Sequence, residues 1–437
     1  MNSYVLHGES RLPDPVTRQA ATLSTTFIWG VLAVGLMLSP IGDFLSVRAS
    51  QGGLAMHGDD ARFSLPIRGA MVAGLMVAML WGFRMRVSGL RLSALAFLAV
   101  LSTSVTYAVG DMSDRECLEQ AVFIFKIFSF FVYLGAMSKL SDSRLAKLES
   151  IVCVVLLVYA AAIVAGATFS VDMFRSYQDD THIRSGYKGI VYAQNEAAAL
   201  VIVGLAFGYL RVLRRGWGLS SVLLVGGMLL AAMLTGTKGA AVGALGVTCA
   251  YYFGRYNPLK ATLRACAVIG VLVAAAVLAY LLVSQVHDAV ELSLRYFQHQ
   301  GGRIGTDKLL TILLSGRNLK FANVWTDLSQ QNYVALLTGG YPVVRYMVEI
   351  DVPDLVLVLG LPVFVVYFAA LFPAFVHRGR RNPVFRFGRL FFCVLMAVAA
   401  TAGHVLGSAV IGPYLAFIAV LLKRSAEQRR RVAGDTT

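Results

Sequence analysis

Long apolar stretches alternate with short polar connections along nearly the whole chain. A helix needs about 20 predominantly apolar residues to cross a bilayer, and windows of roughly this length recur through the sequence. The pattern predicts twelve membrane-spanning helices, at residues 25–45, 67–83, 91–110, 119–138, 149–170, 190–210, 218–235, 239–254, 264–286, 353–376, 388–405 and 409–422.

The composition agrees with this pattern. Hydrophobic residues make up 57% of the 437 residues and charged residues only 14%, which leaves too little polar surface for a soluble globule of this size. We therefore expect an all-α polytopic membrane protein with one membrane domain. Its expected segments are a polar N-terminal segment, nine spans, a large polar loop, three spans and a basic tail, at residues 1–24, 25–286, 287–352, 353–422 and 423–437.

The net charge of +15 arises from basic residues that gather in every second connection, for example at 84–91, 211–215 and 423–431. Cytoplasmic loops of membrane proteins carry such an excess of Lys and Arg. The pattern therefore places both termini in the cytoplasm and the large loop on the outer side. Because topology accounts for the charge, we expect no nucleic-acid partner.

The cysteines do not indicate a metal centre. No pair has the spacing of a metal site, and no loop carries a disulfide framework. Four lie inside apolar windows and one at the start of a window, namely Cys153, Cys249, Cys266, Cys393 and Cys117. We interpret them as small apolar core residues, and we expect neither a metal nor another cofactor.

The polar segment 287–352 is the largest interruption of the apolar pattern. Within it, four apolar residues fall on one face of a predicted helix that follows Ser315. Glycine pairs at 301–302 and 339–340 break the chain around this helix. We expect a small helical cap on the outer face, with its apolar stripe at Phe321, Val324, Trp325 and Leu328.

Several cations face the same predicted side as this cap. Arg184 and Lys188 come just before the polar triplet 194–196, which opens the sixth span. Polar side chains at such depth usually face a bundle interior or a wet cavity. Two plainer interpretations stay open: the cations extend to the membrane surface, and the triplet binds neighbouring helices.

Lys238 lies in a tight turn between the seventh and eighth spans. A cation next to a helix N-terminus favours phosphate oxygens, although a structural turn gives the same pattern. Further along, Arg317 lies in the loop, and three carboxylates follow at the start of the tenth span. Glu349 and Asp351 are of the type that accepts a proton from a sugar hydroxyl. They are equally consistent with carboxylates that mark the start of a helix.

Taken in order, these motifs resemble those of the O-antigen ligase and polymerase superfamily of bacterial envelope enzymes. The similarity covers roughly residues 180–375. It comprises a Gly-x-x-x-x-x-Asn element from Gly189 to Asn195, a Thr-Gly-Thr-Lys turn two spans later, and a Ser-Gly-Arg motif with a downstream Trp325 in a large loop.

The chain also departs from that pattern. Lys238 stands where many relatives carry arginine, which keeps the charge but loses the bidentate fork. The His-Asn pair that many ligases carry before the tenth span is absent, and Glu349-Ile-Asp351 stands in its place. This resembles the pattern of exopolysaccharide polymerases and favours polymerase over ligase.

The resemblance implies a GT-C-like fold and a metal-independent glycosyltransferase that polymerises repeat units carried on undecaprenyl diphosphate. Donor and acceptor would both be lipid-linked glycans, at the periplasmic face of the bacterial inner membrane. A chain-length regulator and a flippase would be partners. Glu349 or Asp351 would act as the base, Asn195 and Trp325 would bind substrate, and six cations would bind the diphosphate, namely Arg184, Lys188, Lys238, Arg303, Arg317 and Arg345.

Two other functions remain open from the sequence. An O-antigen ligase would transfer the glycan to lipid A core instead of to another repeat unit. A flippase for lipid-linked oligosaccharides would also have an even number of spans and internal termini. Transporters, however, commonly show related halves, whereas this chain places its extramembrane mass in one late loop.

Overall fold

The computed structural model describes residues 15–51, 62–83, 87–176, 186–282, 287, 291, 311, 314–330, 332–377, 382–403 and 405–434. Over these residues the chain is all-α, as expected. The helices that precede the large loop are α1 (Pro15–Gln51), α2 (Ser64–Gly82), α3 (Val87–Ala108), α4 (Asp114–Met137), α5 (Asp142–Thr168), α6 (Gln194–Arg215), α7 (Leu219–Leu234), α8 (Lys238–Arg255) and α9 (Pro258–Leu282).

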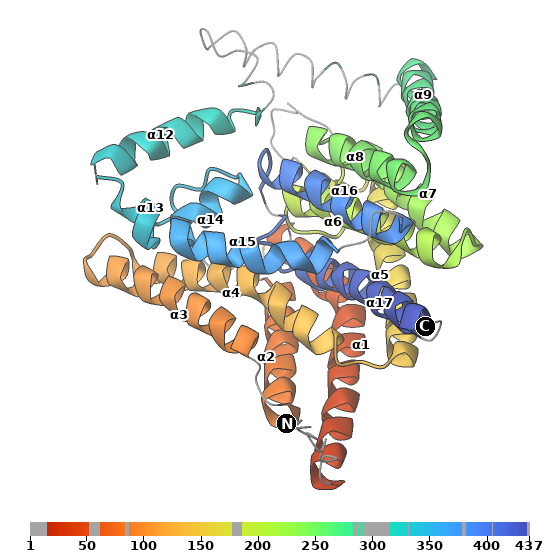
Figure 1. Ribbon diagram of the computed structural model, residues 1–437. Helices are drawn as coiled ribbons and strands as arrows, with labels where there is room; N and C mark the ends of the chain where they lie inside the picture. The colour runs from red at the N-terminus through yellow and green to blue at the C-terminus, as the bar shows by residue number, and fades with distance from the viewer. Residues whose placement is uncertain are drawn as a thin grey trace, which may run out of the picture.

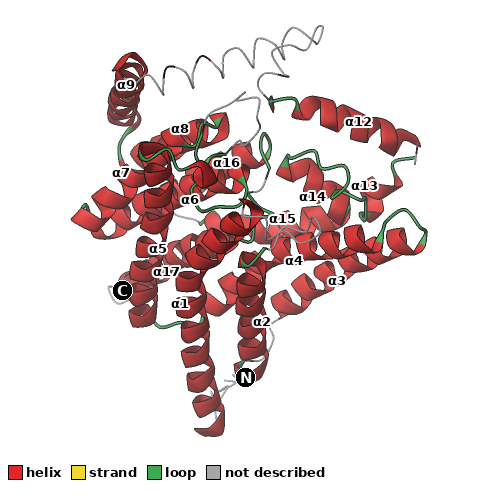
Figure 2. Cartoon of the chain, turned by 180° about the vertical axis from the view of Figure 1, so that it is seen from behind, coloured by secondary structure: helices red, strands yellow, loops and turns green. Residues whose placement is uncertain are grey.

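The loop and the C-terminal part contribute further helices. They are α12 (Arg317–Gln330), α13 (Val334–Thr338), α14 (Asp351–Leu359), α15 (Leu361–Phe375), α16 (Pro383–Ala399) and α17 (Gly412–Gly434). Figures 1 and 2 show α12 lying across one end of the helix bundle, with α13 and α14 next to it.

The architecture is that of a multi-pass membrane protein. Within the described ranges, six helices are long and apolar enough to cross a membrane, α1 to α6, and α7 and α15 are shorter apolar helices. Each of the twelve predicted windows overlaps a helix. The count of twelve spans stays a prediction, because the described residues show six helices that meet both the length and the hydropathy of a span.

The first helix begins earlier than expected. The first apolar window starts at residue 25, whereas α1 starts at Pro15. Proline is well tolerated in the first turn of a helix, where its missing N–H has no partner to lose. The helix therefore includes residues 15–24, nearly three turns at 3.6 residues per turn, before the apolar window starts.

Helix α6 lies at the centre of the bundle. All of its residues from Ala197 to Leu210 are buried, and it packs against α7, α8, α16 and α17. Gly204 and Gly208 face Met228 and Val225 of α7. Small residues let helix backbones approach closely in a membrane, where packing rather than hydrophobic burial drives association.

The tenth predicted span, 353–376, is not one continuous helix. The chain breaks at Gly360, which has a φ of 75°, and forms α14 and α15. The backbone N–H groups of Gly340 and Tyr341 donate to the carbonyls of Val358 and Leu357, at 2.9 and 3.2 Å. These bonds satisfy carbonyls that the break would leave open, which a membrane protein requires of irregular backbone at depth.

Candidate functional site

The segment before α6 is tied to the turn between α7 and α8. The Gln194 side chain donates to the Thr235 carbonyl at 2.9 Å, and the Tyr187 N–H donates to the Leu234 carbonyl at 2.9 Å. Gly186 lies so close to Thr235 that a Cβ could not fit there. Two of the predicted motifs are thus neighbours in space.

Arg317, the first residue of α12, lies between α6 and the segment before α14. Its Nη2 donates to Asn195 Oδ1 at 3.5 Å and lies 3.7 Å from Glu349 Oε2. The side chain is only 15% exposed, and its buried Nε has no hydrogen-bond partner among the described residues. The guanidinium is therefore largely removed from water while its donors are only weakly engaged.

Glu349 is the carboxylate that faces this guanidinium. Its Oε1 also accepts from Lys320 Nζ at 2.5 Å. The residue has a φ of 65°, and Gly403 packs directly on its backbone. A non-glycine residue pays a backbone penalty for this conformation, so the surrounding packing holds the carboxylate at the site.

Asp351 lies two residues further on but has different neighbours. It is buried, at 4% exposure, and its Oδ2 accepts from the backbone N–H groups of Val405 and Leu406, both at 2.8 Å. These bonds anchor the segment between α16 and α17 to the start of α14. The carboxylate oxygen that makes them serves structure, which leaves Glu349 as the more accessible of the two predicted bases.

Arg345 binds a different carboxylate. Its Nε and Nη2 donate to Glu116 at 2.6 Å each, and Nη2 also donates to the Asp111 carbonyl at 3.0 Å. The bond to Glu116 raises the pKa of the guanidinium further above its ordinary value. This fork ties the segment after α13 to the start of α4, beside a cavity of about 730 Å³ that also reaches α3.

Of the other four cations that were predicted to bind the diphosphate, the structure describes two. Lys188 Nζ donates to the Tyr192 carbonyl at 2.8 Å and lies 5.7 Å from the centre of the Tyr192 ring. Lys238 is exposed and begins α8, so the predicted location at a helix N-terminus is confirmed. Arg184 and Arg303 lie outside the described residues.

Trp325 lies on the exposed side of α12, with 45% of its surface accessible. Its ring contacts Phe321 at 5.9 Å and Tyr333 at 5.2 Å between centroids. The predicted apolar stripe of this helix is therefore divided, because Val324 and Leu328 are buried whereas Phe321 and Trp325 form an open aromatic surface.

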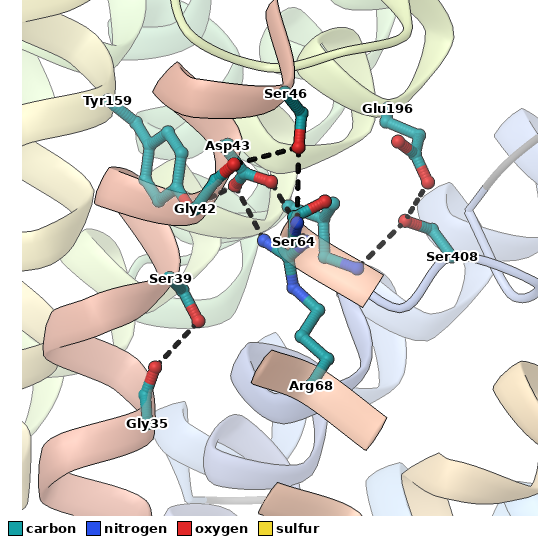
Figure 3. Close-up of polar contacts among 11 residues, drawn as sticks. Gly35, Ser39, Gly42, Asp43, Ser46, Ser64, Arg68, Tyr159, Glu196 and Ser408 are labelled. Carbon is teal, nitrogen blue, oxygen red and sulfur yellow. Dashed lines mark hydrogen bonds and ion pairs between the residues drawn. The ribbon is translucent and has the colours of Figure 1, made fainter. Parts of the chain in front are cut away.

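A buried polar cluster lies among the first spans (Figure 3). Arg68 of α2 donates to both oxygens of Asp43 of α1, at 2.9 and 2.6 Å, and Tyr159 of α5 donates to Asp43 at 2.5 Å. Glu196 accepts from Ser408 at 2.7 Å and is close enough to Arg68 to interact electrostatically. The cluster therefore connects α1 and α2 with the N-terminal end of α6.

Sequence reasoning missed Lys320, Ser408, Asp43 and Arg68. A signal existed for Asp43 and Arg68, because ionisable residues within predicted spans usually mark interior or functional positions. Lys320 and Ser408 gave no such signal, since each looks like an ordinary polar residue of a loop. Their relevance arises only from the side chains that they contact.

The described residues contain no group of three or more His, Cys, Asp or Glu side chains that could hold a metal ion. The site therefore consists of two cations, Arg317 and Lys320, beside one accessible carboxylate, Glu349. Comparisons with protein-family models, with curated proteins and with solved structures give no match to this chain.

Proposed function

We propose that this protein is a glycan polymerase that joins oligosaccharide repeat units carried on undecaprenyl diphosphate, at the periplasmic face of a bacterial inner membrane. The observation that carries the proposal is the meeting of Arg317, Asn195 and Glu349 in a chain rich in apolar helices. A weakly engaged, poorly hydrated guanidinium suits a phosphate group, and a membrane protein gains access to phosphates that are attached to lipids.

The reaction needs a nucleophile and a stabilised leaving group. A hydroxyl of the acceptor glycan attacks C1 of the donor sugar, a new C–O bond forms, and the bond from C1 to the diphosphate oxygen breaks. Undecaprenyl diphosphate leaves with the electron pair of the broken bond, and the hydroxyl proton passes to Glu349. Arg317 and Lys320 stabilise the negative charge that develops on the leaving oxygen.

The ion pairs of Glu349 explain how substrate binding would prepare this base. In the structure, Arg317 and Lys320 both face its carboxylate. A diphosphate carries more negative charge than one carboxylate, so it draws both cations towards itself. Glu349 is then free to accept a hydrogen bond from the acceptor hydroxyl, in the geometry that general-base catalysis requires.

The aromatic surface on α12 suits the glycan part of the substrate. Trp325, Phe321 and Tyr333 present adjoining rings that are partly exposed. Aromatic rings offer a large rigid contact area with an apolar face, against which the C–H face of a sugar can pack. Lys188 and Lys238, near the start of α6 and α8, are further candidates for the diphosphate.

The direct test uses purified protein in lipid with an undecaprenyl-diphosphate-linked repeat unit. We expect Arg317→Ala to lower the rate of chain extension on the order of 10²- to 10³-fold, because the leaving group loses its main cation. Arg115→Ala is the matched control, since Arg115 is an exposed arginine of α4 that pairs with Glu119 on the surface. A wild-type rate of extension by Arg317→Ala would refute the assigned role.

A deletion strain separates the proposal from its two alternatives. Loss of a polymerase leaves single repeat units displayed on the outer side. Loss of a flippase holds them at the cytoplasmic leaflet, and loss of a ligase leaves finished polymer on its lipid carrier. We expect the first result, and either of the others would replace the proposed function.

A further inference from the structure

A second charged cluster lies at the other end of α6. Glu149 of α5 is 1% exposed and faces three arginines of the last turns of α6. The distances from its oxygens are 3.7, 3.2 and 2.7 Å, to Arg211, Arg214 and Arg215. One buried carboxylate therefore has to balance three guanidinium groups.

A cavity of about 160 Å³ lies beside this cluster, between α5, α6 and α17. Its charged lining consists of three arginines and two carboxylates, so the positive charges outnumber the negative ones, at Arg214, Arg215, Arg424, Asp142 and Glu149. Arg211 adds a further positive charge behind them, and its buried Nη1 has no hydrogen-bond partner among the described residues. An anion placed in this cavity would relieve the excess.

The guanidinium groups differ in how many donors they have left. Arg424 is largely engaged, because Nη2 donates to the carbonyls of Ser138 and Leu140 at 3.2 and 2.8 Å. Among the described residues, Arg214 and Arg215 each make one hydrogen bond, to Glu149, at 3.2 and 2.7 Å. Arginine has five N–H donors, so within this part of the chain both retain donors for a ligand.

The position of the cavity indicates where such an anion would come from. Candidate spans begin at Asp142 and end at Arg215, so the cavity lies at the level where apolar helices meet the aqueous boundary. Figures 1 and 2 both show α17 beside α5 in this part of the molecule. Phosphates of membrane lipids lie at this level, and basic pockets between helices bind anionic headgroups.

We propose that this cavity binds the phosphate of an anionic phospholipid, through Arg214 and Arg215. The site is separate from the Arg317 site, at the opposite end of α6, and it does not depend on the proposed polymerase activity. Binding there would hold α5, α6 and α17 together, because the cavity is lined by residues of all three helices. No chemical step is involved.

The test is native mass spectrometry of the full chain, released from detergent and titrated with phosphatidylglycerol. We expect saturable binding to the wild type and an affinity at least about tenfold weaker in Arg215→Gln, which is the magnitude of one charge-assisted hydrogen bond. Lys423→Gln is the matched control, because Lys423 is an exposed cation next to Arg424 that does not line the cavity. We expect Lys423→Gln to weaken the affinity for phosphatidylglycerol only about twofold, as is typical of an exposed charge.

Three outcomes would overturn the proposal. Equal loss in both variants would show unspecific attraction to a basic surface. Equal binding of phosphatidylcholine, whose phosphate is balanced by a choline cation, would show that the cavity does not select anionic lipids. Displacement by inorganic phosphate at the same concentration would assign the cavity to a free anion. If Arg215→Gln does not fold, Arg215→Lys keeps the charge without the planar fork and should still lower the affinity.

Discussion

Glu149 and Glu349 each face arginine side chains near opposite ends of α6, but they are held differently. Glu149 is 1% exposed and has three arginines around it. Glu349 is 34% exposed and has one arginine at 3.7 Å and one lysine at 2.5 Å. In the first cluster the carboxylate is closed off and only the arginines around it keep donors for a ligand, whereas in the second cluster a substrate can still reach the carboxylate itself.

The difference shows that the role of an ion pair depends on how deeply it is buried and on whether another ligand can reach its charged groups. A buried carboxylate that is paired with several cations, such as Glu149, is costly to disturb and stabilises mainly one arrangement. A partly exposed pair at long distance, such as Arg317 and Glu349, contributes little to stability, so its arrangement is better explained by binding. The following variants separate these two situations, from the largest expected effect to the smallest.

The largest loss of stability is expected at the buried carboxylate of Glu149. Glu149 is buried, and Glu149→Ala leaves Arg211, Arg214 and Arg215, which are 13%, 20% and 43% exposed, without their common carboxylate. Removing one partner of a buried pair costs about 3–5 kcal/mol of folding free energy. Thermal unfolding of the purified protein in detergent measures the loss. Asp142→Asn serves as control, because Asp142 is 63% exposed. If Glu149→Ala were as stable as this control, the cluster around Glu149 would not be structural.

The largest loss of activity without loss of stability is expected at the pair of Arg317 and Glu349. Arg317→Ala and Glu349→Gln should each lower the rate of chain extension on the order of 10²- to 10³-fold, as loss of one charge-stabilising group does in other enzymes. The double variant should be little worse than either single one, because the proposed reaction has both residues act in one step. Additive losses in a steady-state assay would mean that the two side chains act independently.

A smaller effect is expected where the chain breaks between α14 and α15. In Gly360→Ala the new Cβ would lie 2.5 Å from the Leu337 carbonyl oxygen, at a φ of 75°. The strain should cost about 1–3 kcal/mol and loosen the segment that carries Glu349. Gly226→Ala, where the added Cβ meets nothing within 4 Å, is the matched control in the same unfolding measurement. Equal midpoints would show that the break tolerates a side chain.

The smallest change in stability is expected for Lys320→Ala. The side chain is 51% exposed, so loss of its ion pair should change folding free energy by at most about 1 kcal/mol. In the proposed reaction, the Michaelis constant for the lipid-linked donor should nevertheless rise, because one of the cations proposed to bind its phosphates is removed. Lys320→Arg retains the charge and should restore most of the affinity. A variant with unchanged donor affinity would remove Lys320 from the site.

The sequence alone determined the helical class and the position of most helices. Hydrophobic periodicity is a local property, so the windows for α2, α4 and α6 could be read directly from the residues. The helix after Ser315 was also foreseeable, since α12 runs from Arg317 to Gln330. The break at Gly360 was harder to predict, because it depends on Gly340 and Tyr341 satisfying the freed carbonyls.

Only the tertiary structure decided which charged residues meet. Asn195 and Arg317 are 122 residues apart in the chain, and Arg345 and Glu116 are 229 apart. The sequence shows that Arg345 and Arg317 are cations, but it does not show which side chains they contact. It could therefore not distinguish Arg345, which anchors a segment, from Arg317, whose N–H donors are only weakly engaged. The physical reason is that pairing depends on distance, burial and competing hydrogen bonds, which arise only when helices distant in sequence pack together.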